Sequence, residues 1–137
     1  MTTVVAALIQ QNGLLLICQR RRTDAFPLRW EFPGGKVKHG ESAAAALVRE
    51  LAEELGVTAV IGHELYRTRH RYAEYADELE LIFFTAAIPA PHDTGSIRNL
   101  AFERIEWVEP TALEQYDFLL ADRELISLLT SGALRVP

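Results

Sequence analysis

Residues 35–57 read GKVKHGESAAAALVRELAEELGV. Serine is favoured immediately before a helix and glycine immediately after one, so Ser42 and Gly56 predict a helix that runs to about Leu55. The apolar residues of this helix recur on one side at helical spacing, and that side must pack on a sheet. They are Ala44, Leu47, Val48, Leu51 and Leu55.

The other side of the predicted helix is acidic. Glu50, Glu53 and Glu54 fall within roughly 100° of arc, and Arg49 lies beside them. Three carboxylates on one stripe repel one another, more strongly when they are partly buried. A divalent cation among them removes this repulsion, and carboxylate oxygens suit hard ions such as Mg²⁺, with Mn²⁺ as a substitute. The alternative interpretation is a solvated acidic face without a ligand.

The spacing of these residues resembles the signature of the Nudix hydrolases. The matching positions are Gly35, Glu41 and the run Arg49-Glu50-Leu51-x-Glu53-Glu54-x-Gly56-Val57. The resemblance implies an α/β fold, the α/β/α sandwich in which a mixed sheet is flanked by helices. It also implies one Nudix domain over residues 1–137, with the signature at 35–57. The implied reaction is hydrolysis of a phosphoanhydride in a nucleoside diphosphate linked to another group, with Mg²⁺.

The resemblance assigns roles to individual residues. Glu50, Glu53 and Glu54 are the metal-ligand positions, and the Gly34 carbonyl is a candidate backbone ligand. Glu53 or Glu50 is the general base for the attacking water, and the sequence leaves these two open. Arg49 is expected to orient the carboxylates through a bidentate ion pair, with phosphate contact as the alternative.

Similarity to one branch of the family extends beyond the signature. The runs Trp30-Glu31-Phe32-Pro33-Gly34-Gly35-Lys36-Val37 and Tyr116-Asp117-Phe118-Leu119-Leu120-Ala121-Asp122 look like the MutT and CTP-pyrophosphohydrolase branch. This implies hydrolysis of nucleoside triphosphates, often oxidised or modified, to a monophosphate and pyrophosphate, and a role in cleaning the nucleotide pool. Arg20, Phe32 and Asp122 are the expected substrate contacts, and Phe118 is a second candidate to flank the base.

Asp122 departs from the MutT pattern, in which an Asn reads the base. An ionised Asp only accepts hydrogen bonds, whereas Asn both donates and accepts. We therefore expect a base that presents N–H groups, such as the cytosine amino group or purine N–H groups, rather than strict 8-oxoguanine selectivity. The alternative role for Asp122 is to cap the last helix.

A second departure concerns the number of metal ions. Relatives often carry a metal-binding Glu about six residues before the Trp that corresponds to Trp107, where this chain has Ala101-Phe102. Glu103 and Glu80 are the nearest acidic candidates. Glu41 either assists the metal through water or complements the helix N-terminus.

Residue patterns predict the remaining elements. Strands are expected at 4–10 and 14–19, joined by an Asn12-Gly13 turn, and at 30–32, 57–72, 79–88 and 101–108. A loop is expected at 89–99, a short helix from Pro110, and a helix over 121–129.

Composition restricts the class of protein. The 137 residues suffice for one domain, and 14 basic against 19 acidic residues argue against a nucleic-acid-binding surface. The apolar runs are too short to span a membrane. The single cysteine, Cys18, excludes an internal disulfide, so we expect a cytoplasmic protein. The family resemblance implies a nucleotide as its substrate, and we expect a monomer or a homodimer.

Two alternatives to a triphosphate pyrophosphohydrolase stay open. The signature binds metal and pyrophosphate and does not select the attached group, so ADP-ribose or a dinucleoside polyphosphate are alternative substrates. A nucleotide-sensing domain without activity is the other alternative. The complete set Glu50, Glu53 and Glu54 argues against it, since a binding module has no need of all three.

Overall fold

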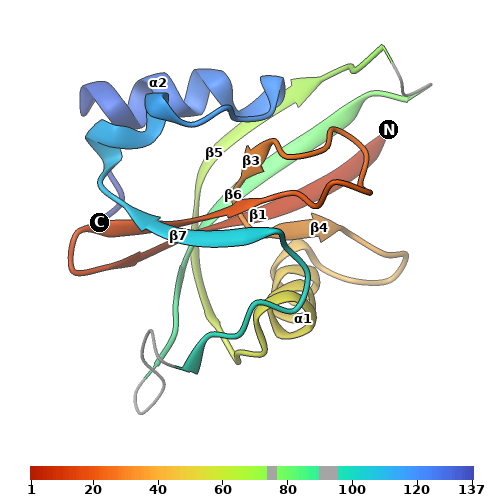
Figure 1. Cartoon of the computed structure of the whole chain (residues 1–137). Helices are drawn as coiled ribbons and strands as arrows, with labels where there is room; N and C mark the ends of the chain where they lie inside the picture. Colours follow the sequence, from red (N-terminus) through yellow and green to blue (C-terminus); the bar gives the residue numbers. More distant parts are fainter. Residues whose placement is uncertain (74–76, 90–95) are drawn as a thin grey trace.

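The computed structural model of the chain describes residues 1–73, 77–89 and 96–137. Figure 1 shows a central sheet with α1 below it and α2 above it. Along the chain the elements are β1 (Thr2–Gln11), β2 (Leu14–Gln19), β3 (Trp30–Glu31), β4 (Gly34–Lys36), α1 (Ala43–Leu55), β5 (Val60–His70), β6 (Leu79–Ala87), β7 (Arg104–Val108), the 3₁₀ segments η2 (Pro110–Gln115) and η3 (Leu120–Asp122), and α2 (Arg123–Ser131).

The sheet is mixed, as expected. Its strand order is β3-β2-β1-β6-β5, while β4 pairs with β1 and β7 pairs with β2. The central strands β1 and β6 are parallel, from Thr2 opposite Leu79 to Ile9 opposite Ala86. The other strand pairs are antiparallel. Strand β1 therefore has partner strands along both of its edges and lies in the middle of the sheet.

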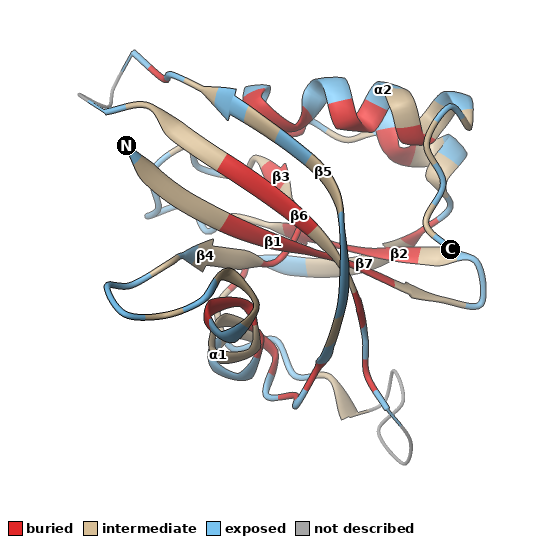
Figure 2. Ribbon diagram, turned by 180° about the vertical axis from the view of Figure 1, so that it is seen from behind, coloured by how far each residue is buried: buried red, intermediate tan, exposed pale blue. Residues whose placement is uncertain are grey.

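Two hydrophobic cores cover the two faces of the sheet. Side chains alternate along a strand, so Val5 and Ile9 pack on the α1 side while Ala6 and Leu8 pack on the α2 side. Figure 2 shows the buried residues on the central strands and on the sides of the helices that face them. This is the predicted α/β/α sandwich.

Helix α1 begins and ends where the sequence predicts. The Ser42 hydroxyl accepts from the Ala45 N–H at 3.1 Å, and Gly56 closes the helix in a left-handed conformation with φ of 67°. The predicted apolar stripe is fully buried at Leu47, Leu51 and Leu55. At Ala44 and Val48 it is only half-buried, and Ala46 is buried instead.

Strands β3, β5, β6 and β7 are shorter than predicted, and α2 has the predicted length but lies two residues later in the chain. Strand β5 occupies only 60–70 of the expected 57–72, and α2 begins at 123 because 120–122 form a 3₁₀ turn. Strand β7 begins at Arg104 rather than Ala101 because the Asn99 side chain binds both the N–H and the carbonyl of Phe102, which holds that segment in a loop. Of the loop predicted at 89–99, residues 90–95 lie outside the described part.

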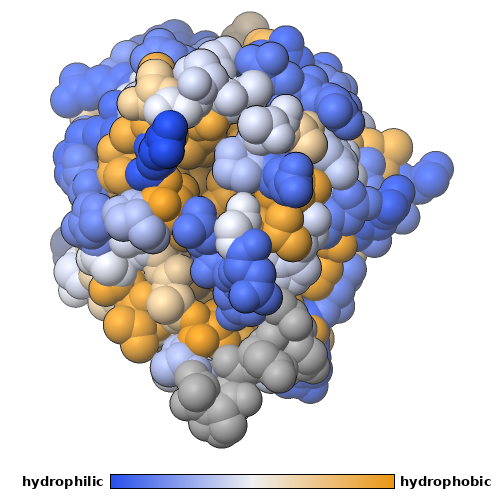
Figure 3. Space-filling model, turned by 90° about the vertical axis from the view of Figure 1, so that its left-hand side faces the viewer, coloured by the Kyte–Doolittle hydropathy of each residue, from blue (hydrophilic) through white to orange (hydrophobic). Residues whose placement is uncertain are grey.

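The face of the molecule shown in Figure 3 carries both hydrophilic and hydrophobic residues. In Figure 3, hydrophobic residues form small groups separated by hydrophilic ones. Among the described residues, the large hydrophobic side chains that are exposed are Met1, Val60, Leu100 and Leu120. No helix within the described ranges has the length and apolar character needed to cross a membrane. Cys18 is buried as a small apolar residue.

Candidate active site

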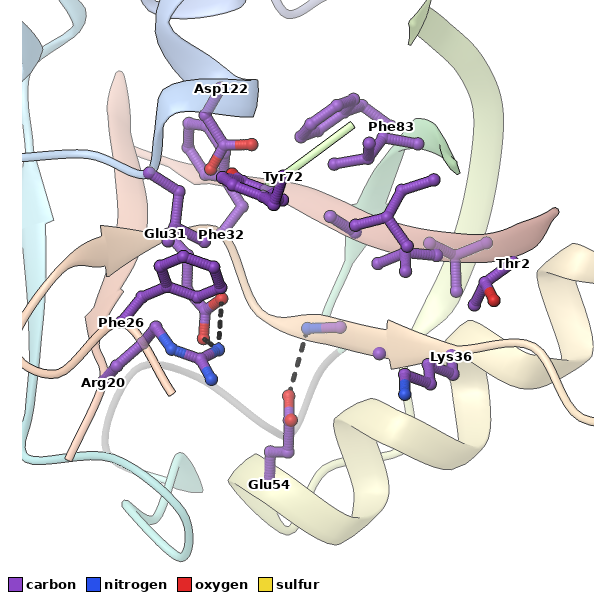
Figure 4. Close-up of a pocket in the computed structure, with 18 of the residues that line it drawn as sticks. Thr2, Arg20, Phe26, Glu31, Phe32, Lys36, Glu54, Tyr72, Phe83 and Asp122 are labelled. Carbon is purple, nitrogen blue, oxygen red and sulfur yellow. Dashed lines mark hydrogen bonds and ion pairs between the residues drawn. The ribbon is translucent and has the colours of Figure 1, made fainter. Parts of the chain in front are cut away.

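A cavity of about 380 Å³ opens beside β1 and β4. Its lining includes Glu54 and the glycines of β4 on one side and Asp122 on the other. Figure 4 shows Glu54 and Asp122 at opposite sides of this space, with Arg20 and Glu31 between them. The acidic helix and the segment 116–122, which are far apart in sequence, therefore contribute to one site.

The Glu54 carboxylate lies in an unusual electrostatic environment. It accepts from the Gly34 N–H at 3.0 Å. Burial raises the pKa of Glu54 to about 9, and the nearby carboxylates of Glu31 and Glu50 add to this shift. An acid held this way binds a proton or a cation at neutral pH.

Glu50 lies against the backbone of β4. A Cβ atom on Gly35 would lie 2.4 Å from the carboxyl carbon of Glu50, so any larger residue at this position would displace this carboxylate. The Glu50 side chain is 15% exposed, whereas that of Glu53, one turn further on, is 54% exposed. Glu50 is thus held against the sheet, whereas Glu53 faces solvent.

Arg49 binds more carboxylates than the sequence predicts. Its bidentate ion pair is made with Glu41, from Nε at 2.7 Å and Nη2 at 2.9 Å. Its Nη1 donates to Glu50 at 2.9 Å and, more weakly, to Glu53 at 3.4 Å, and Nη2 also donates to the Lys36 carbonyl at 3.1 Å. Arg49 therefore connects α1 to β4 and to the loop before the helix.

The role of Glu41 follows from this contact. Hydrogen bonds from Arg49, and from the backbone N–H of Lys38 at 2.9 Å, lower the pKa of Glu41 to about 2. Glu41 thus stays ionised and holds Arg49 in place. The pairing of Glu41 with Arg49 was not predicted. Glu41 lies just before the helix and eight residues before Arg49, and this spacing was the available signal.

The donor set fits a hard divalent cation. Glu50, Glu53 and Glu54 share one face of α1, and burial together with the neighbouring carboxylates raises the pKa of Glu54. Within the described residues, no three His, Cys, Asp or Glu side chains converge as a preformed metal site. In this structure Arg49 holds Glu50 and Glu53, so a cation bound here would share these carboxylates with Arg49.

The far side of the cavity is aromatic and acidic. Phe32 and Asp122 both line it, and each is only 3% exposed. Phe118 packs against Phe32 with ring centroids 5.5 Å apart, is a core residue and does not line the cavity. Asp122 precedes α2 without a capping hydrogen bond from its side chain, so the alternative role as a cap is wrong.

Arg20 lines the same cavity but is already paired. Its Nη1 lies 3.1 Å from Glu31 Oε1, and its Nε donates to the Ala25 carbonyl at 2.6 Å. Burial raises the pKa of Glu31 to about 6 against the opposing effect of Arg20. The sequence predicted Arg20 and not Glu31, although a lone acid between Trp30 and Phe32 was a signal for it.

Two further lining residues were not predicted. Phe26 and Tyr72 face each other with ring centroids 4.7 Å apart and form a wall of the cavity. The Tyr72 hydroxyl accepts from the Ala121 N–H at 3.0 Å, which joins the end of β5 to the segment before α2. Sequence patterns held no signal for either residue, because their contacts depend on how distant segments pack.

The acidic residues considered as extra metal ligands lie elsewhere. Glu80 lies 3.5 Å from Arg67 and 3.8 Å from Arg69. Glu103 lies 3.9 Å from Arg22. Neither glutamate lines the cavity.

Comparison with known proteins identifies the family. The model of the NUDIX domain matches residues 1–129. The chain belongs to the Nudix hydrolase family. This Nudix chain is 35% identical over 126 residues to the CTP pyrophosphohydrolase of Escherichia coli (strain K12), with 92% of this chain and 89% of that protein covered. It is 34% identical over 134 residues to the nucleoside triphosphatase NudI of Escherichia fergusonii, with 92% and 94% covered.

Solved structures of other Nudix proteins share the fold. The solution structure of the E. coli ORF135 protein matches with a TM-score of 0.79 and 32% identity, covering 97% of this chain and 91% of that one. The MutT protein of methicillin-resistant Staphylococcus aureus matches with a TM-score of 0.72 and 28% identity, covering 96% of both chains. The chain is therefore a Nudix enzyme of ordinary architecture.

Proposed function

We propose that the protein hydrolyses nucleoside triphosphates, modified or oxidised ones included, to the monophosphate and pyrophosphate, and so cleans the nucleotide pool. The main observation in support is that one cavity is lined both by Glu54, from the acidic face of α1, and by Phe26, Phe32, Tyr72 and Asp122. In this proposal the phosphates lie at the Glu54 side of the cavity and the base lies at the aromatic side. The names of the relatives, a CTP pyrophosphohydrolase and a nucleoside triphosphatase, agree with this substrate class.

The acidic side would hold Mg²⁺, with Mn²⁺ as a substitute. Glu50, Glu53, Glu54 and the Gly34 carbonyl are the groups available to bind it. Bound there, a divalent cation would supply positive charge for the polyphosphate and would activate the attacking water.

The chain supplies the base for the attacking water. The reaction is water plus triphosphate: the water oxygen bonds to the β-phosphorus, and the bond from this phosphorus to the bridging oxygen of the α-phosphate breaks. Glu53 is the better acceptor of the water proton, since its carboxylate is 54% exposed and only weakly bound by Arg49. Glu50, which is firmly held, is the better ligand, and Arg49 positions both.

The remaining residues bind the nucleotide. Lys36 lines the cavity near Glu54 and supplies a positive charge for the phosphates. Phe32 offers an apolar surface to the base, and Asp122 makes the polar contact with the base. Arg20 holds Glu31 at the edge of this surface and contacts the substrate from there.

The deciding experiment is a pyrophosphate-release assay with Glu53→Gln. The substitution keeps the shape of the side chain and removes the base, so we expect kcat to fall by at least about a hundredfold. Glu114→Gln, an exposed glutamate on η2, is the matched control and should keep wild-type activity. Excess EDTA should abolish turnover.

The substrate panel should contain dCTP, 5-methyl-dCTP, 8-oxo-dGTP, dGTP, CTP and ADP-ribose. Pyrophosphate release from a triphosphate supports the proposal. Hydrolysis of ADP-ribose alone, or full activity of Glu53→Gln, contradicts it. Nucleotide binding without turnover of any substrate would identify a sensor instead.

A further inference from the structure

Segment 97–100 contacts the end of helix α1, although it lies far from the helix in the sequence. The N–H of Arg98 donates to the Leu55 carbonyl at 2.9 Å, and the N–H of Leu100 donates to the Glu54 carbonyl at 3.0 Å. A helix leaves its last carbonyls without donors of its own, so these two bonds complete the final turn of α1. Figure 1 shows this segment, which precedes β7, beside the end of α1.

The side chain of Arg98 covers the glycine that ends the helix. A Cβ atom on Gly56 would lie 3.0 Å from Arg98 Nε and 3.1 Å from Nη2, so the guanidinium occupies the space where a side chain would stand. The last turn of α1 contains no basic residue of its own, but it does contain Glu53 and Glu54. A cation is favourable at the negative end of a helix dipole and acidic side chains are unfavourable there, so Arg98 supplies the charge that this turn lacks.

The segment that carries Arg98 is itself firmly held. The Asn99 side chain binds both the N–H and the carbonyl of Phe102, each at 2.9 Å, and Phe102 is buried in the core on the α1 side of the sheet. Just beyond it, the N–H of Glu103 donates to the Gln19 carbonyl at 2.9 Å. These contacts fix the segment to the sheet, so the segment can hold the last turn of α1 in place.

We propose that Arg98 is a positioning residue for the metal site, which holds the last turn of α1 so that the Glu53 and Glu54 carboxylates lie where the cation binds. Arg98 does not line the cavity, so it acts through the helix end and not by contact with the substrate. The connection is short, because the Glu54 carbonyl accepts from Leu100 while the Glu54 side chain accepts from the Gly34 N–H. This deepens the proposed function and rests on it for the metal.

The end of α2 offers a matched control. Gly132 ends α2 in the same left-handed conformation, with φ of 78° against 67° for Gly56. A Cβ atom on Gly132 would lie 3.6 Å from Arg135 Nη2 and 3.8 Å from Nε. Both helices thus end in a glycine with an arginine beside it, but none of the candidate metal ligands lies on α2. Substitutions at Arg98 and Arg135 therefore separate an effect on a helix end from an effect on the metal site.

The first test measures metal binding without turnover. Arg98→Met keeps a long side chain over Gly56 and removes its charge, and we expect it to raise the dissociation constant of Mn²⁺, measured by EPR, by about tenfold or more. Arg98→Lys keeps the charge and should retain most of the affinity. Arg135→Met should bind Mn²⁺ as the wild type does. Glu53→Gln, which removes a ligand, identifies the Mn²⁺ that is bound at this site.

The sign of the change distinguishes positioning from a direct electrostatic effect. A guanidinium near the carboxylates repels a cation, so removing its charge without moving the helix would tighten Mn²⁺ binding. Positioning predicts the opposite change, because the carboxylates lose their arrangement. Tighter or unchanged Mn²⁺ binding by Arg98→Met would therefore overturn the proposal.

The second test observes the helix end directly in metal-free protein. The N–H groups of Leu100 and Gly56 donate to carbonyls of the last turns of α1 at 3.0 and 3.1 Å, so their hydrogen exchange reports whether this end is closed. Arg98→Met should speed exchange at both positions, whereas Arg135→Met should not. Wild-type exchange rates in Arg98→Met would show that this side chain does not hold the turn, and would overturn the proposal.

The outcomes separate this inference from the proposed function. A protein that hydrolyses triphosphates, and in which Arg98→Met binds Mn²⁺ as the wild type does, overturns the inference and leaves the function intact. A protein that hydrolyses no triphosphate, and in which Arg98→Met weakens Mn²⁺ binding, overturns the function and supports the inference. In an active enzyme, Arg98→Met should raise the Mg²⁺ concentration for half-maximal activity by the same factor as the Mn²⁺ dissociation constant, while the KM for nucleotide at saturating Mg²⁺ stays close to that of the wild type.

Discussion

Two adjacent glycines in β4 are required for different reasons. A Cβ atom on Gly34 would lie 1.9 Å from the backbone oxygen of Val5, and one on Gly35 would lie 2.4 Å from the carboxyl carbon of Glu50. The first contact is with the backbone of the central strand, which has little room to move. The second contact is with the end of the Glu50 side chain, which is flexible and has room to move.

Substituting alanine at these positions should separate stability from activity. We expect Gly34→Ala to lower the free energy of unfolding by about 3 kcal/mol or more, since the β1–β4 pairing must shift. Gly35→Ala should stay within about 1 kcal/mol of wild type but lose at least about tenfold in kcat, because Glu50 is displaced. Urea denaturation and the pyrophosphate assay measure the two effects. Equal loss of stability in both variants would contradict this explanation.

At the scale of elements, local signals predicted the ends of α1 and of β2. The ends of α1 depend on Ser42 and Gly56 and on the residues next to them, all within a few positions, so the sequence showed both ends. The start of β7 depends on Asn99 binding Phe102, and the helical turn before α2 depends on packing against Tyr72. Such contacts leave no periodic pattern, and the predicted bounds were wrong there.

The cap of α1 offers a test at this scale. Ser42→Ala removes the hydrogen bond to the Ala45 N–H and should lower the free energy of unfolding by about 1 kcal/mol. The active-site carboxylates lie at the other end of the helix, so kcat should not change. Ser127→Ala, an exposed position inside α2, is the matched control and should cost less than about 0.5 kcal/mol. A loss as large in Ser127→Ala would show that the cap is not the cause.

At the scale of the whole molecule, buried acids make stability depend on pH. The Glu31 side chain is 20% exposed and its pKa is raised to about 6, so the folded state binds its proton more tightly than the unfolded state does. Its contribution to stability is therefore complete below about pH 4.5 and declines as the pH rises through 6. The shift corresponds to about 2 kcal/mol.

Glu31→Gln should abolish this part of the pH dependence. In metal-free protein, the free energy of unfolding of the wild type should fall by about 2 kcal/mol relative to Glu31→Gln between pH 4.5 and pH 8. Urea denaturation at several pH values gives both curves. Parallel curves would mean that Glu31 titrates normally in the folded protein.

The candidate site was only partly visible in the sequence. Glu50, Glu53 and Glu54 were predicted together because they lie on one helix, and Arg20, Phe32 and Asp122 because of their resemblance to a family. Placing the last three in one cavity required the fold. The surroundings of the site include the Glu31 carboxylate near Asp122 and the ion pair between Glu41 and Arg49. These contacts join segments that are separated in the sequence, so residue spacing does not predict them.

The parallel pairing of β1 with β6 also constrains the order in which the chain assembles during synthesis. The hairpin of β1 and β2 needs only residues that leave the ribosome together, since Gln10 pairs with Leu15. The opposite edge of β1 finds no partner until residues 79–86 have been made. Until then this edge of β1 exposes unpaired backbone N–H and C=O groups. Strands of other chains can pair with such an edge, so the nascent chain is open to aggregation at this stage.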